Sequence, residues 1–348
     1  DVYKRQNPVF PAGASASFTL TVKVSDLGLV DARPGVVYLL GVHVLGYPGD
    51  EANQTVGRSR VMMPWRPGEA DPKVSPVVLL SSAPATGLDP GIFSDDHLAA
   101  ELQGRLETLL QAAELEGSTA LVDPGMIAEL RSMARGYRLR NGVTVAARDP
   151  RARRAHAWIQ RFEALRSRGR VYRVPWGHPD IASGAASKQT WVLKQARQAM
   201  KGSPEADLPL ALWMPNGATP TREQREFLAP LKPALWVQPA HSSGLTTLEG
   251  QKVLGYEPGL TSGGPGPVPS DSQPQRLGRM ISQILLSPSP EVLPVTTEAE
   301  ARTVLDLPQW VRTVGLDELT ETATLSPAPA RQSQAISDGR WRTAASAR

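Results

Sequence analysis

A chain of 348 residues is long enough for two domains, or for one large barrel with an appendage. Its 41% hydrophobic content suffices for a core, and its net charge of +4 is a mild excess for this length. The sequence contains no cysteine, which excludes disulfides, thiolate catalysis, zinc–cysteine sites and iron–sulfur clusters. No apolar run reaches the ~18–20 residues of a membrane-spanning helix.

The N-terminal part is predicted to be a partial antiparallel β-sandwich of the immunoglobulin-like kind, over residues 7–66. Residues 1–6 are interpreted as a translated sequencing-adapter junction and are left out of the fold. Residues 18–24 alternate apolar and polar as a half-buried strand does, 36–45 are apolar on both faces, and 57–63 are a third strand candidate. Two or three strands alone do not make a stable sheet. The first strands of the sandwich are therefore expected to be missing.

A linker is predicted over 67–74, then an α/β domain over 75–325, then a disordered Pro/Ala-rich tail over 326–348. In the α/β domain about seven apolar strand candidates alternate with amphipathic segments. Helices are expected at 95–113, 124–135, 151–168, 185–201, 221–231, 274–286, 298–305 and 308–313. This alternation predicts parallel strands joined by right-handed crossovers in a distorted (β/α) barrel, with an open doubly wound sheet as the alternative. No G-x-G-x-x-G follows the first strand, so a dinucleotide site is not expected.

Four of the apolar runs end at a proline next to a polar residue. They lie at 120–124, 171–180, 210–216 and 235–241. Because the carboxyl ends of parallel strands meet at one edge, their polar side chains are predicted to converge on a single rim. The residues expected there are Asp123, Trp176, His178, Asp180, Asn216 and His241.

Asp123 has two interpretations. A carboxylate where a barrel strand meets its loop is a common catalytic position. An Asp followed by Pro124 is also a standard helix start, and this interpretation is favoured from the local sequence.

The richest cluster is Trp176-Gly177-His178-Pro179-Asp180. A tryptophan can stack on a sugar face, a histidine can move protons near neutral pH, and an aspartate can act as a base. The alternative is a tight turn in which Asp180 caps the next helix. The two interpretations are about equally supported, since loop-borne His and Asp at strand ends are frequent in functional sites.

Other candidates carry weaker signals. Glu257 is a candidate second carboxylate for a glycosidase-like pair, and Gln238 is a candidate ligand-binding residue beside the rim. Residues 95–97 (Asp-Asp-His) suit a helix start better than a metal site, so no metal and no cofactor are predicted. Four arginines between 148 and 154 are interpreted as a solvated helix start rather than a nucleic-acid or anionic-polymer patch.

Several short motifs resemble an uncharacterised family of secreted, membrane-anchored actinobacterial cell-envelope proteins. The motifs are 11–18 (PAGASASF), 35–42 (GVVYLLGV), 57–60 with Pro64-Trp65, 95–99 (DDHLA), 121–124 (LVDP), 133–137 (MARGY) and 174–180 (VPWGHPD). The resemblance implies an extracytoplasmic middle fragment of a longer protein, with a signal sequence and a membrane helix outside it. It also implies a central domain like the barrels of carbohydrate deacetylases and glycoside hydrolases. Position 182 is Ala, so His178 lacks the H-x-x-x-H partner of zinc deacetylases, and that activity is disfavoured.

The function expected from the sequence is binding of cell-wall glycan, or of another envelope component, without a complete catalytic set. An active glycan hydrolase using Asp123 and Asp180, with Glu257, is one alternative, and a non-catalytic scaffold for envelope assembly is another. No nucleic-acid partner is expected, and membrane contact is expected only through regions outside this chain. The oligomeric state stays open.

Overall fold

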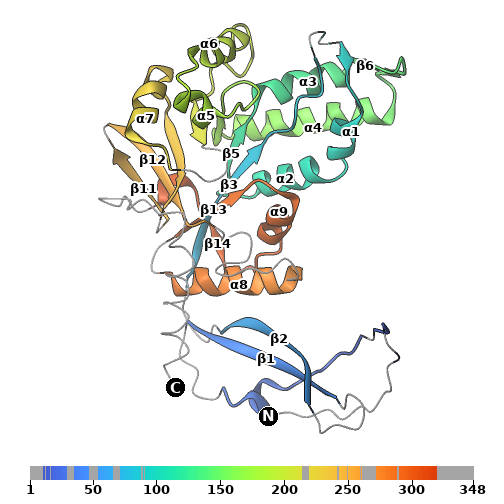
Figure 1. Ribbon diagram of the computed structural model, residues 1–348, viewed down its shortest axis with the longest axis vertical. Coiled ribbons are helices and arrows are strands. Elements are labelled where there is room, and N and C mark those ends of the chain that lie inside the picture. Colours follow the sequence, from blue (N-terminus) through green and yellow to red (C-terminus); the bar gives the residue numbers. More distant parts are fainter. Residues whose placement is uncertain are drawn as a thin grey trace.

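The computed structural model consists of an α/β body and an N-terminal two-stranded ribbon (Figure 1). It describes residues 11, 13–15, 17–29, 35–46, 54–65, 71–87, 89, 91–213, 219–240, 243–248, 250–258, 260, 272–287 and 290–319.

The body is built on seven parallel strands in two sheets. They are β3 (Lys73–Leu80), β5 (Thr119–Val122), β8 (Val171–Arg173), β9 (Ala211–Trp213), β10 (Leu235–Pro239), β12 (Gln251–Tyr256) and β13 (Glu291–Val295). One sheet has the order β13-β3-β5-β8, and the short β14 (Arg312–Thr313) also pairs with β3. The other has the order β11-β12-β10-β9, in which β11 (Gly244–Leu248) is antiparallel to β12. A parallel bridge between Arg173 and Leu210 joins the two sheets edge to edge.

The strands are apolar because both of their faces are covered. Alternate residues of the strands meet in one buried cluster, which contains Val77, Leu79, Leu121, Ala211, Trp213, Leu235, Val237, Leu254, Tyr256 and Val292. From β8 the half-buried Tyr172 packs against this cluster, and Val174, directly after β8, belongs to it. The intervening residues, such as Val78 and Leu80, face the helices. Strands β12 and β13 also contact each other, although no ladder joins them among the described residues. The predicted mixed α/β class with parallel strands is confirmed, whereas hydrogen-bonded closure of a barrel is not shown.

Nine α-helices are found in the described part of the chain. They are α1 (His97–Glu101), α2 (Arg105–Glu114), α3 (Pro124–Ala134), α4 (Pro150–Ser167), α5 (Ile181–Ala186), α6 (Thr190–Ala199), α7 (Arg222–Leu228), α8 (Gln273–Leu286) and α9 (Glu298–Leu305). Short 3₁₀ turns occupy η1 (Val24–Leu27), η3 (Ala229–Leu231) and η4 (Leu316–Glu318). None of these helices combines the length and the apolar character that crossing a bilayer requires.

Three of the helix predictions were wrong in detail. The helix expected at 95–113 is interrupted because Gly104 leaves the helical conformation and precedes α2 as its N-cap. The one expected at 185–201 is divided into α5 and α6, and Lys188 between them has a positive φ of 52°. The piece expected at 308–313 contains no helix, because its last residues pair with β3 as β14.

A small side sheet was not anticipated. Its strands β4 (Ile92–Phe93), β6 (Gly136–Leu139) and β7 (Thr144–Ala146) lie in the order β4-β6-β7. Strand β6 contacts α3, near which Figure 1 shows it, and β7 contacts α4. The signal was the alternation of buried Tyr137, Leu139 and Val145 with exposed neighbours, which is short and easily read as a loop.

The ribbon consists of β1 (Val36–Gly46) and β2 (Gln54–Trp65), which pair antiparallel. Helix α8 packs so closely on it that a Cβ at Gly278 would lie 2.7 Å from the carbonyl oxygen of Met62. The strand predicted at 18–24 was wrong: residues 18–23 are irregular, and η1 begins at Val24. Within the described residues the ribbon is thus one two-stranded sheet, and a sandwich is not shown.

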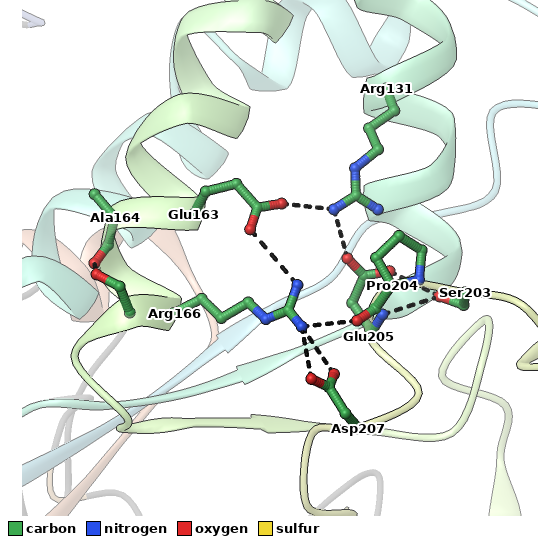
Figure 2. Close-up of polar contacts among 9 residues, drawn as sticks. Arg131, Glu163, Ala164, Arg166, Ser203, Pro204, Glu205 and Asp207 are labelled. Atoms are coloured by element: carbon green, nitrogen blue, oxygen red, sulfur yellow. Dashed lines mark hydrogen bonds and ion pairs between the residues drawn. The ribbon is translucent and has the colours of Figure 1, made fainter.

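The loop that leads into β9 is tied to α3 and α4 by charged groups (Figure 2). Arg131 of α3 donates to Glu163 of α4 and to Glu205, each at 2.6 Å. Glu205 is only 1% exposed and also accepts from Ser203, so its carboxylate is satisfied although buried. This network fixes α3, whose first turn borders the candidate site described next.

Candidate functional site

Asp123 lies where β5 ends, and its side chain holds two turns at once. It is the N-cap of α3, with Pro124 at the first helical position, and its Oδ1 accepts the backbone N–H of Gly125 at 2.8 Å. The same oxygen accepts the backbone N–H of Gly177, also at 2.8 Å, from the loop after β8. The structure therefore shows the helix cap that the sequence favoured, and adds a clamp between neighbouring strand ends.

The environment of this carboxyl changes its titration. Asp123 is 2% exposed. Burial raises its pKa to about 6, while the N–H groups of Gly125, Gly177 and Met126 act in the opposite direction, and the charge of Glu129 adds to the rise. A carboxyl with this pKa titrates close to neutral pH.

The loop held by Asp123 carries Trp176 and His178. Two consecutive residues have positive φ, Gly177 at 73° and His178 at 38°, and the N–H of His178 donates to Pro175 O at 2.8 Å. A positive φ at a residue other than glycine costs conformational energy, so surrounding contacts must maintain this turn.

The turn packs tightly on the start of α3. A Cβ at Gly125 would lie 3.1 Å from Gly177 N and 3.2 Å from both Trp176 Nε1 and Asp123 Oδ1. A side chain at position 125 would have to displace these atoms by a few tenths of an ångström, so glycine suits this close approach. Trp176 remains half-buried, so part of its indole faces solvent at the rim.

The ring of His178 is largely enclosed. Its Nε2 is buried and has no hydrogen-bond partner among the described residues. Burial lowers the pKa of the imidazole, which keeps the ring neutral near neutral pH. A neutral imidazole with one unsatisfied nitrogen has the capacity to donate to or accept from a polar ligand.

Asp180 belongs to the same loop but is occupied elsewhere. It is exposed and caps α5, where its Oδ1 accepts from Ser183 N at 3.0 Å and its Oδ2 accepts from Ser183 Oγ at 2.6 Å. These hydrogen bonds agree with the tight-turn interpretation, in which Asp180 caps the next helix.

Two further candidates belong to the second sheet, on β10 and directly after β12. Gln238 is 5% exposed and shares its face of β10 with Trp236, which packs against α5 and α7 rather than in the interstrand cluster. Glu257 directly follows β12 and is half-buried. Asn216 and His241 lie outside the described residues. The structure thus brings together Asp123, Trp176 and His178, from the adjacent strands β5 and β8.

Two residues that secure the neighbouring rim were missed in the sequence. Arg105 of α2 donates to Ser81 O at 2.5 Å and to Thr296 O at 3.5 Å, which links the ends of β3 and β13. Glu129 of α3 accepts from the N–H groups of Ala85 and Thr86. Both lie inside ordinary helical patterns, so no local signal distinguished them.

The Asp-Asp-His stretch at 95–97 forms hydrogen bonds within the protein. His97 Nδ1 contacts Asp95, and its Nε2 lies 3.1 Å from Ala83 O. The pKa of His97 is raised: burial acts to lower it, but the hydrogen bond to Asp95 outweighs burial with help from Ala83. No group of three or more His, Asp or Glu side chains in the described part of the chain is arranged to hold a metal ion.

Comparisons with known proteins find only distant similarity. No protein-family model matches the sequence, and no curated protein matches it significantly. A solved structure from Mycobacterium smegmatis, described as a polysaccharide deacetylase, is 11% identical, with 75% of this chain and 97% of that chain covered and a TM-score of 0.38. The alpha-amylase AmyC from Thermotoga maritima is 11% identical, with 55% of this chain and 46% of that chain covered and a TM-score of 0.30.

Both of these proteins are named as carbohydrate-active enzymes, and the α/β body is similar to theirs only coarsely. At these TM-scores the likeness does not decide the function. The function is therefore argued from the residues of the site, and the envelope family suggested by the short motifs stays a prediction.

Proposed function

We propose that this protein binds cell-wall glycan outside the cytoplasmic membrane, at the carboxyl ends of β5 and β8, without cleaving it. The observation that carries the proposal is the hydrogen bond from Gly177 N to Asp123, which fixes a half-buried Trp176 and an unsatisfied His178 at this rim. An aromatic surface beside a few oriented polar atoms is the composition that a sugar ring requires.

The proposed architecture is an open, distorted barrel of seven strands. It is supported by the cluster against which side chains of all seven strands pack and by the contact between β12 and β13. In such a barrel the ligand lies at the carboxyl ends of the strands, where the Trp176 loop is found. The extracytoplasmic location rests on the sequence motifs alone.

Binding is favoured over hydrolysis because the proposed pair of carboxylates is already engaged. Most glycosidases need two carboxyl groups directed at the scissile bond. Here Asp123 accepts two backbone N–H groups, and both oxygens of Asp180 are bonded to Ser183. One observation supports the hydrolase alternative: a pKa of about 6 would let Asp123 hold a proton, as a general acid does.

The test compares two tryptophans that differ in position. Wild type, Trp176→Ala and Trp191→Ala are incubated with insoluble peptidoglycan and with arabinogalactan, and the bound fraction is measured over a range of protein concentrations. Trp191 is the matched control because it lies on α6 and is 63% exposed. We expect Trp176→Ala to bind about tenfold more weakly, equivalent to about 1.4 kcal/mol for one stacking contact, and Trp191→Ala to bind as wild type does.

Two results would contradict the proposal. One is equal retention of wild type and Trp176→Ala on both polymers. The other is release of soluble sugar by wild type but not by Asp123→Asn, which would establish the hydrolase instead.

A further inference from the structure

The positive charge of the chain is concentrated in one short segment. Residues 131–154 contain eight arginines, one aspartate, and no lysine or glutamate, so the segment carries a net charge of +7 against +4 for the whole chain. The remainder of the protein is thus slightly acidic, and the excess belongs to the end of α3, the β6–β7 hairpin and the start of α4.

Two of these arginines are paired with carboxylates of the described residues. Arg131 is paired with Glu163 and Glu205, and Arg151 is paired with Asp149 and Asp96. The other six form no ion pair with a carboxylate of the described residues, and they are Arg135, Arg138, Arg140, Arg148, Arg153 and Arg154. Five of the six are exposed, the exception being the half-buried Arg154. We refer to these six residues as the arginine face.

The β6–β7 hairpin presents part of this face to solvent. Tyr137 and Leu139 point into the core, so the alternation of β6 leaves Arg138 and the following Arg140 on the outer side. Arg135 and Arg138 line a shallow hollow of about 460 Å³, together with Gly91, Gly136, Thr144 and Ala146. Tyr137 and Val145 complete the lining, and the hollow is open to solvent, so a ligand can approach it from outside.

Further positive charge lies at the N-terminal end of α4, where the helix dipole disfavours it. Arg153 and Arg154 lie in the first turns of an 18-residue helix, next to the positive end of its dipole. By contrast, the first turn of α9 carries Glu298 and Glu300. Asp149 caps α4 and pairs with Arg151, so this one carboxylate offsets only part of the positive charge at the helix start. Arg153 and Arg154 are therefore available to a ligand with negative charge.

We propose that the arginine face binds an anionic glycan, a polysaccharide whose repeating units carry carboxylate or phosphodiester groups. The choice of a glycan rests on the proposed function, and the charge of the ligand rests on the arginines. Guanidinium groups bind carboxylate and phosphate oxygens in pairs, and a row of them suits a polymer with regularly spaced anions.

Two other polyanions fit the face less well. Proteins that bind single-stranded nucleic acid usually add aromatic side chains on which bases stack, but Tyr137 is 5% exposed and donates to Asp96. An anionic membrane would be expected to take up apolar side chains, and Val143 is the one large exposed apolar residue of segment 131–154.

The experiment measures binding of the full chain to soluble polygalacturonate, poly(glycerol phosphate) and neutral dextran over a series of salt concentrations. Polygalacturonate carries carboxylates and poly(glycerol phosphate) carries phosphodiesters, so comparing the two shows which anionic group is bound. Double-stranded DNA and phosphatidylglycerol vesicles serve as competing polyanions. The variants are Arg138→Gln/Arg140→Gln and Arg138→Lys/Arg140→Lys. A double variant of exposed lysines, Lys194→Gln/Lys201→Gln, makes the same change in net charge elsewhere.

We expect at least one anionic glycan to bind with an affinity that falls steeply with salt. The glutamine variant should lower that affinity about tenfold or more and reduce the salt slope by about one for each lost arginine contact. The lysine variant should lie between it and wild type, and the control variant should match wild type.

The inference is overturned if the glutamine and control variants lose affinity equally, if neither glycan binds, or if DNA or vesicles bind more tightly than both glycans. These outcomes are independent of the Trp176 test, since that test uses a different residue. Thermal unfolding of each variant shows whether exposed substitutions have left the fold intact.

Discussion

Asp123 and Asp180 begin helices in two neighbouring loops, yet their environments differ. Both follow a strand of the same sheet, and both accept a backbone N–H of the helix that they cap. Asp180 is exposed and accepts from Ser183, three residues away, whereas Asp123 is buried and also holds Gly177, 54 residues away. A local sequence signal thus gives the cap correctly in both cases, while burial decides which cap also organises the site.

The two caps should differ most in stability. Asp123→Ala would leave the N–H of buried Gly125 and that of Gly177 without this acceptor, whereas Asp123→Asn keeps an accepting oxygen. We therefore expect Asp123→Ala to have a free energy of unfolding about 4 kcal/mol below that of Asp123→Asn. The same pair of substitutions at Asp180 should differ by about 1 kcal/mol. Urea denaturation of the four variants measures both differences, and equal differences would show that the clamp adds nothing to the cap.

The raised pKa of Asp123 predicts that the stability of the protein depends on pH through this carboxyl group. Because the native pKa is about 6 and the ordinary value is 3.8, the folded state binds the proton more tightly than the unfolded state. The stability from this group is fully present below pH 3.8 and is lost as the pH rises through 6. Relative to Asp123→Asn, wild type should lose about 2 kcal/mol between pH 4 and pH 7. Parallel stability curves for the two proteins would contradict the burial of this carboxyl.

Glycines near the two caps offer a smaller test with opposite signs. Gly125 has three atoms within 3.2 Å of where a Cβ would lie, whereas Gly184 of α5 has none within 4 Å. Gly125→Ala should therefore destabilise the protein by about 1–2 kcal/mol and displace the Trp176 loop. Gly184→Ala should stabilise it by about 0.5–1 kcal/mol, since alanine favours the helix. Thermal unfolding measures the stability of both variants, and tryptophan fluorescence reports on the Trp176 loop. A Gly125→Ala variant more stable than wild type would contradict the close packing of the loop on α3.

The fold could be predicted from the sequence where apolar runs are long. Strands such as β3 and β10 are buried on both faces, so their apolar composition identified them and their alternation with helices indicated parallel sheets. The interruption of the first predicted helix could not be predicted from periodicity. The stripe of leucines continues across Gly104, but the backbone leaves the helical conformation there. At the N-terminus, the alternation of residues 18–24 suggested a strand, but Phe18 and Leu20 are exposed and no neighbouring strand pairs with them in the described residues.

The site was predictable only in part. The sequence correctly indicated that Asp123 and the Trp176 loop end neighbouring parallel strands, because both follow apolar runs. It did not show that the Asp123 carboxyl bonds to the backbone of Gly177, since no side-chain pattern marks a backbone donor. Nor did it show that six arginines would remain unpaired, because this depends on which carboxylates lie across the fold.

The most direct test asks whether Asp123 positions the binding loop rather than taking part in chemistry. A soluble fragment is prepared from the cell-wall polymer to which the wild-type protein binds. Its affinity is then measured for wild type, Asp123→Asn and Asp123→Ala. We predict that Asp123→Asn binds within about twofold of wild type, because its amide oxygen still accepts the N–H of Gly177, while Asp123→Ala binds about tenfold more weakly. Equal binding by all three proteins would contradict the clamp, and so would a loss in Asp123→Asn as large as in Asp123→Ala.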